Sequence, residues 1–163
     1  MWRPVLGPAV LLVLLLSACY RATPPPRLDG PLAITIDTNR SRLIAAQGPL
    51  QQEVARACRR DLGWRVDPTA AKRLVLTIND DDISATSHGD LGIARRWRME
   101  ISGTWTLHRP GHDPITGRFS GSGHAARRDH EANALRAAAA NAADAIAAQV
   151  SLAVSRKAPP APP

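Results

Sequence analysis

The segment RWRMEISGTWTL, residues 96–107, has the most regular alternation in the chain. Its odd-numbered positions hold apolar residues or glycine, and its even-numbered positions hold polar or charged residues. Successive side chains of a strand point to opposite faces of a sheet, so this segment predicts a long strand with one buried face and one wet face. One wet face is typical of antiparallel sheets, because parallel sheets are covered on both faces.

Two further strands flank this segment and extend it into hairpins. Residues 73–87 contain the mostly apolar run LVLTI at 74–78 and become polar at NDDD, residues 79–82. Residues 115–124 also alternate, with apolar residues or glycine at odd positions and polar residues at even positions. Three of the odd positions, which are expected to point inward, are glycines. Glycine adds no side chain, so these positions leave room for a helix, or for a tryptophan of the neighbouring strand, to lie close above them. Turn-forming residues at 87–90 and 109–114 connect the three strands.

Two helices are predicted, one before the hairpins and one after them. The first runs from Gly48 to Leu62 with apolar residues at helical spacing, and Gly63 ends it. Cys58 lies on its apolar stripe, so we expect a buried thiol rather than a nucleophile. The second helix covers residues 129–154, where many alanines permit close approach to the sheet and have high helix propensity.

Two short strands, at residues 32–37 and 64–66, complete the pattern. The resulting order β-α-β-β-β-β-α predicts one α+β domain over residues 32–154. We expect a four- to five-stranded, mostly antiparallel sheet with two helices packed on one face. Hydrophobic residues make up 44% of the 163 residues, which is enough for a packed core.

The N-terminus predicts an export signal. An apolar run over residues 5–16 follows a single arginine and has the length of a signal-peptide core. The run ends in LSAC, residues 16–19, which resembles the bacterial lipobox. We therefore expect residues 1–18 to be removed and Cys19 to be the site of lipid attachment. The alternative is an ordinary signal peptide in which Cys19 is a bystander.

A lipid anchor holds a folded domain at a membrane without a spanning helix. Acyl chains on Cys19 would contribute about 0.8 kcal/mol per buried methylene. Tyr20 follows the cysteine where, in the enterobacterial sorting rule, an aspartate favours the inner membrane, so we expect the periplasmic face of the outer membrane. Residues 19–31 predict a proline-rich tether, and residues 155–163 predict a proline-rich tail. We expect no membrane-spanning stretch after residue 20.

Arginine is the informative charged residue. The chain has 21 lysines and arginines against 14 acidic residues, a net charge of +7. Arg95, Arg96 and Arg98 cluster at the start of the longest strand, and guanidinium groups bind phosphate in bidentate fashion. An exported domain meets lipid phosphates rather than nucleic acid, so these three are candidate anionic-lipid ligands and no nucleic-acid partner is expected. The alternative is a solvated strand face.

Nothing in the sequence predicts catalysis, a cofactor or a metal. The aspartates at 80–82 point to alternating faces of a strand, so they cannot easily converge on one ion; we interpret them as a solvated segment that discourages edge pairing. The five histidines show no ligand spacing, and no nucleophile elbow, phosphate loop or dinucleotide fingerprint is present. We therefore expect a protein that is not an enzyme.

The layout of the exported part resembles one family, the LPS-assembly outer-membrane lipoproteins (LptE/RlpB-like). The resemblance covers residues 32–154. It is carried by the lipobox, by AITI at 33–36, by the helix start GPL at 48–50, by DPTAA at 67–71 followed by LVLTI at 74–78, and by the closing helix ADAIAAQV at 143–150.

This resemblance implies two helices on one side of a four-stranded sheet. It also implies a protein that plugs a large outer-membrane β-barrel, helps to assemble it and binds lipopolysaccharide. The expected partners are then an outer-membrane β-barrel protein and lipopolysaccharide. Two alternatives share the signal and the layout: an auxiliary lipoprotein of an ABC-type lipid transporter, and a lipoprotein activator of cell-wall synthesis.

Overall fold

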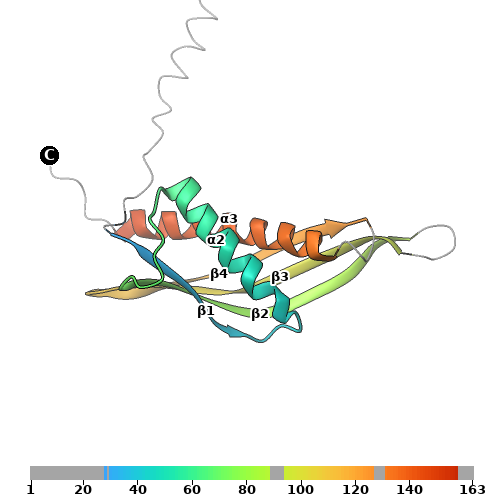
Figure 1. Cartoon of the computed structure of the whole chain (residues 1–163), viewed down its shortest axis with the longest axis horizontal. Helices are drawn as coiled ribbons and strands as arrows, with labels where there is room; N and C mark the ends of the chain where they lie inside the picture. Colours follow the sequence, from blue (N-terminus) through green and yellow to red (C-terminus); the bar gives the residue numbers. More distant parts are fainter. Residues whose placement is uncertain (1–27, 29, 89–93, 127–130, 158–163) are drawn as a thin grey trace, which may run out of the picture.

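The predicted hairpins are present, and they belong to one sheet with two helices beside it (Figure 1). The computed structural model describes residue 28 and residues 30–88, 94–126 and 131–157. The elements in chain order are β1 (Leu32–Asn39), the short 3-10 helix η1 (Ile44–Ala46), α2 (Gln47–Leu62), β2 (Lys72–His88), β3 (Ala94–Arg109), β4 (His112–Ala125) and α3 (Glu131–Lys157). The fold is α+β, as predicted.

The sheet is mixed, and its strands lie in the order of the chain, β1-β2-β3-β4. β1 and β2 are parallel, whereas β2 with β3 and β3 with β4 are antiparallel. A parallel pair needs a crossover connection, and α2 provides it. The prediction of a mostly antiparallel sheet of four to five strands is confirmed, with four strands in the described part of the chain.

The core lies on one face of the sheet. Met99, Ile101, Trp105 and Leu107 of β3 point to this face, and each is at most 2% exposed. α3 packs over β3 and β4, while α2 packs against β1 and α3, so both helices lie on this face (Figure 1). The alternation predicted for residues 96–107 is therefore confirmed. Their polar side chains lie on the other face, which no element of the described residues covers.

Glycines of β4 allow close packing above the strand. A Cβ on Gly121 or on Gly123 would collide with the backbone of α3 around Ala138. Gly117 has a different neighbour, because a Cβ there would lie 2.5 Å from the ring of Trp105. Both kinds of neighbour were predicted from the sequence, a helix and a tryptophan of the adjacent strand.

The C-terminus of α2 also agrees with the prediction. Gly63 has a φ of 66°, and the N–H of Trp64 donates to the Cys58 carbonyl at 3.1 Å. Cys58 itself is a free, fully buried thiol. The pKa of Cys58 is raised to about 12, first by burial and then by the charge of Asp61, while Arg59 opposes the shift. The thiol is thus protonated and inert at neutral pH, as its place on the apolar stripe predicted.

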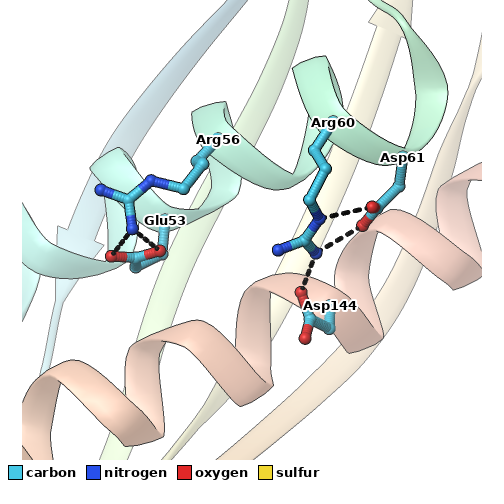
Figure 2. A network of polar contacts seen from close by, with 5 residues as sticks. All are labelled: Glu53, Arg56, Arg60, Asp61 and Asp144. Carbon is cyan, nitrogen blue, oxygen red and sulfur yellow. Dashed lines mark hydrogen bonds and ion pairs between the residues drawn. The ribbon is translucent and has the colours of Figure 1, made fainter.

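An arginine connects the two helices at the surface, as Figure 2 shows. Arg60 of α2 donates to Asp61 of its own helix and, across 2.7 Å, to Asp144 of α3. One turn earlier, Arg56 binds both carboxylate oxygens of Glu53 at 2.8 Å. Both arginine side chains are more than half exposed, so water screens these ion pairs and they contribute little to stability.

Two of the predicted local elements are wrong, and a third is displaced, because Ser87 and His88 of the turn predicted at 87–90 belong to β2. Residues 64–66 form no strand, because Val66 makes only a single bridge with Leu32 at the outer side of β1. The turn predicted at 109–114 consists only of Pro110 and Gly111, since the residues on either side already pair with each other. Gly111 has a φ of 73°, which lets two residues reverse the chain.

The predicted boundaries of the closing helix also need correction. α3 extends to Lys157, three residues into the segment predicted as a tail. Nothing breaks the helix before the first proline of the tail, so the last turn continues. The predicted start of this helix at residue 129 lies outside the described residues.

α3 overturns the expectation that no stretch after residue 20 could span a membrane. Residues Glu131–Arg156 are long and apolar enough by length and composition, because an 18-residue window within them has a mean hydropathy of 1.3. The residues that make them so are mostly small alanines packed on the sheet; Ala138, Ala142, Ile146 and Val150 are fully buried. The hydropathy of α3 is therefore explained by its position in the core.

Candidate functional site

The predicted lipid ligands lie at the start of β3. Arg96 and Arg98 stand two residues apart, so they share the face of the sheet that the helices leave open. Arg96 is exposed and Arg98 is half-buried. Arg95 belongs to β3, but its side chain lies outside the described residues, as does Cys19. The structure thus brings two of the three predicted arginines together on one face.

Arg98 is an ion-paired cation. Its Nη2 donates to the Glu100 carboxylate at 2.8 Å, and the two side chains are 43% and 38% exposed. Its Nε is buried and has no hydrogen-bond partner within the part of the chain that the structure describes. A phosphate would have to compete with Glu100 for Arg98, so Arg96 offers the more accessible positive charge.

The surroundings of these arginines carry both signs of charge. The register places His124 of β4 beside Arg98 and Asp82 of β2 beside Glu100. A carboxylate next to the ion pair repels a phosphate, so the open face is not a continuous basic surface. At this end of the open face, anion binding is therefore favoured near Arg96 rather than at Arg98.

The three aspartates of β2 do not converge on one point. Asp80 and Asp82 share the open face, whereas Asp81 points to the other face and accepts a hydrogen bond from the Arg42 backbone N–H at 2.6 Å. The prediction that they alternate between faces is confirmed. Among the described residues, no group of three His, Cys, Asp or Glu side chains could hold a metal ion.

A small apolar hollow lies near the same end of the sheet. Its volume is about 210 Å³, below the roughly 300 Å³ at which pockets for small-molecule ligands begin. It can take the end of one acyl chain but not a lipid with several chains. The hollow is lined by Ile83, Trp97, Arg98, Met99, Ala125, Glu131 and Ala134.

Sequence reasoning missed this hollow. The alternation of β3 shows that Trp97 and Met99 point inward, but it does not show where the cover of the helices becomes incomplete. One feature of the sequence could have indicated the hollow: Ile83 is an apolar residue directly after three aspartates. In the structure Ile83 is 40% exposed, which is unusual for a large apolar side chain on the core face.

Comparisons with known proteins were informative only at the level of structure. No protein-family model matches the chain, and no curated protein sequence matches it either. Rare lipoprotein B from Shewanella oneidensis is similar in structure, with a TM-score of 0.51 at 14% identity; the match covers 79% of this chain and 100% of that one. A minor lipoprotein from Acinetobacter baumannii has a TM-score of 0.46 at 11% identity, covering 84% of this chain and 100% of that one.

The likeness to rare lipoprotein B defines the architecture as one found in a bacterial lipoprotein. More specifically, the chain has an LptE/RlpB-like fold, since its likeness to rare lipoprotein B spans the whole of that structure. The fold expected from the sequence layout is thereby confirmed.

Proposed function

We propose that this chain is an outer-membrane lipoprotein that binds and helps to assemble a β-barrel LPS translocon, and so contributes to lipopolysaccharide transport to the cell surface. The observation that supports this most is the likeness to rare lipoprotein B over 79% of the chain. The lipobox at residues 16–19 agrees with it, because it would anchor the domain through Cys19 at the periplasmic face of the outer membrane.

The end of the sheet supports a contact with an anionic amphiphile. Arg96 presents an exposed guanidinium on one face, and the apolar hollow opens near the same end. Because Arg96 is on the open face and the hollow is on the helix face, a lipid would pass around the end of the sheet, with a phosphate at Arg96 and the end of one acyl chain in the hollow. At about 210 Å³ the hollow cannot hold the remaining chains. The proposal therefore requires a partner that covers most of the lipid, and a β-barrel lumen is suited to this.

A pull-down tests the protein partner. The tagged full-length lipoprotein is isolated from membranes in mild detergent, and the bound proteins are identified and quantified by mass spectrometry. We expect a heat-modifiable outer-membrane β-barrel in stoichiometric amount. The variant Cys19→Ala serves as a control, because it should leave the membrane fraction and lose the barrel. An ABC transporter component or a cell-wall synthase as the main partner would overturn the proposal.

A titration with lipid A tests the arginines. The triple substitution of Arg95, Arg96 and Arg98 by glutamate should weaken binding to phosphorylated lipid A, because it replaces attraction by repulsion. The matched control substitutes Arg59, Arg65 and Arg73 by glutamate; these arginines are exposed and lie elsewhere in the domain. Equal loss in both variants would show only an effect of net charge, and no loss in either would assign the three arginines to a solvated face.

A further inference from the structure

The two edges of the sheet differ in how well they are protected. An edge strand presents unpaired backbone N–H and C=O groups to which another strand can add. On β1 these groups are occupied: Leu32 donates to the Arg65 carbonyl at 2.8 Å and accepts from the Asp67 N–H at 3.0 Å. The next outward carbonyl, that of Ile34, accepts a hydrogen bond from Gln51 of α2 at 2.7 Å. β1 is therefore closed to strand addition there.

The half of β2 that extends past β1 is protected in another way. β1 pairs with β2 only as far as Ile78, so the following residues of β2 form a second exposed edge. Three consecutive aspartates stand there, and the pairing with β3 is irregular between Ile78 and Asp80 and again near the end of the strand. Charges and bulges are features that discourage edge pairing.

β4 has a different arrangement at the opposite edge. Asn141 of α3 donates from its side chain to the Ser122 carbonyl at 2.6 Å, so this carbonyl points away from β3. The pairing of β4 with β3 is regular from residue 115 to residue 125. Backbone groups of a strand alternate between its two sides, so those of Thr116, Arg118 and Ser120 point outward as well.

These three residues form an unprotected window. Each is exposed, and their outward N–H and C=O groups have no partner among the described residues. The window is bounded on one side by Pro114, which has no N–H to donate, and on the other by the hydrogen bond of Asn141. Three donors and three acceptors in a row can hold a short extended peptide.

We propose that residues 116–120 of β4 bind an extended, acidic segment of a partner protein as an added antiparallel strand. Arg118 stands at the centre of the window with its side chain on the open face of the sheet. The residue directly opposite Arg118 on an added strand lies within reach of its guanidinium, so an aspartate or glutamate is favoured there. This inference does not depend on the proposed function.

Charge argues against a second copy of the chain as the occupant. Two windows related by a two-fold axis would pair antiparallel about their centres. Arg118 of one copy would then lie directly opposite Arg118 of the other, and like charges in that position are destabilising. A partner with an acidic residue converts the same position into an attractive pair.

α3 adds an apolar contact beside the window. Leu152 is 52% exposed, and it lies eleven residues, close to three full turns, after Asn141. The two side chains therefore project from the same side of α3, the side that reaches the edge of β4. Residues of an added strand that point to the helix face would meet this flank, so apolar residues are favoured on either side of the acidic one.

Amide hydrogen exchange with a defined peptide tests the proposal. The probe is the blocked heptapeptide Ser-Thr-Val-Glu-Val-Thr-Ser, added to the full chain in detergent micelles. The amides of Thr116, Arg118 and Ser120 should exchange fast in the free protein and become protected on binding, whereas those of Gly117 and Phe119 should be slow throughout. Replacing the glutamate of the peptide by lysine should weaken binding about fivefold, and Arg118→Glu should reverse this preference.

Modified peptides and one further variant serve as controls. N-methylation of the glutamate and both threonines, whose N–H groups would face β4, should abolish protection, while N-methylation of both valines should not. Arg73→Glu reverses a charge at an exposed position of β2. It should leave the preference for the glutamate peptide over the lysine peptide unchanged. Absence of protection at millimolar peptide, or equal protection with either methylated peptide, would overturn the proposal. Protection that depends on protein concentration without peptide would instead indicate self-association and also overturn it.

Discussion

The indole nitrogen of Trp105 donates a hydrogen bond to Oε1 of Gln149 at 2.9 Å and so joins the middle of β3 to α3. Trp105 is 2% exposed, and its ring also covers Gly117 of the neighbouring strand. One large side chain of β3 therefore contacts both α3 and β4. In a core made mostly of small aliphatic residues, this contact aligns α3 along the sheet.

We predict that Gln149→Met lowers the stability of the domain. The substitution keeps the length of the side chain but removes the acceptor, and a buried indole N–H without a partner costs about 1–3 kcal/mol. The free energy of unfolding from urea titration measures this loss. Gln149→Glu retains an acceptor and should remain close to the parent protein; equal losses in both variants would contradict the role of the hydrogen bond.

Alanine at Gly121 should be strongly destabilising. Its Cβ would collide with the backbone of α3 at Ala138 and Ala142, and backbone atoms cannot move aside without displacing the helix. We expect a loss of about 1–3 kcal/mol or more, the usual range for overpacking. Thermal and urea unfolding both report it.

Gly48 provides the matched control for this substitution. It lies in the first turn of α2, is exposed, and has nothing within 4 Å of the position that a Cβ would take. Gly48→Ala should be neutral or stabilising by up to about 1 kcal/mol, since alanine has the higher helix propensity. Similar losses at Gly48 and Gly121 would contradict the assigned packing.

Cys58 should make the domain sensitive to alkaline pH. Its pKa is raised from about 9 to about 12 by burial in the folded state, so folding favours the protonated thiol. The contribution of the protonated thiol to the free energy of unfolding is therefore complete below pH 9 and is lost as the pH rises from 9 to 12. The raised pKa corresponds to at most about 4 kcal/mol. Urea midpoints between pH 8 and pH 11 should fall, and Cys58→Ala should remove this part of the decline.

The same thiol should resist labelling. We expect maleimide to react slowly with native protein at pH 8 and rapidly once urea unfolds it, because only the exposed thiolate is a nucleophile. Since Cys19 is expected to be acylated, Cys58→Ala provides the blank. Fast labelling of the folded protein would show that Cys58 is not enclosed as described.

The ion pair between the two helices should matter little for stability. Asp144→Asn removes the partner that Arg60 reaches from α2, but both side chains are 56% exposed and Arg60 keeps Asp61. Water and salt screen such pairs, so the melting temperature should barely change. A large decrease would mean that the contact in Figure 2 orients α2 on α3.

Local patterns accounted for most of the elements. The alternation in residues 96–107 predicted β3 and its buried face, and Gly63 predicted the end of α2, because both signals depend only on backbone geometry and near neighbours. The predictions were wrong where the structure of a segment depends on its contacts with a distant segment of the chain. Residues 64–66 have the composition of a strand, yet only Val66 finds a partner along β1.

The candidate site was less accessible to sequence reasoning. The clustering of Arg96 and Arg98 on one face followed from their spacing of two. The ion pair of Arg98 with Glu100 uses the same spacing, but whether it forms depends on the rotamers that the neighbouring strands allow. The apolar hollow depends on where the helices leave the inner face uncovered, which no local pattern encodes.

Short-range sequence order thus determined the long strands, their inward faces and the end of α2, because each of these signals depends on the backbone preference and spacing of neighbouring residues. Long-range packing decided which residues of α3 meet the sheet and are fully buried, among them Ala138, Ala142 and Ile146. It likewise decided that Gln51 closes one edge of the sheet, while the outward backbone groups of Thr116, Arg118 and Ser120 at the other edge have no partner among the described residues. Both outcomes depend on which segments meet across the fold, because an edge is defined by the absence of a neighbour and burial by the presence of one.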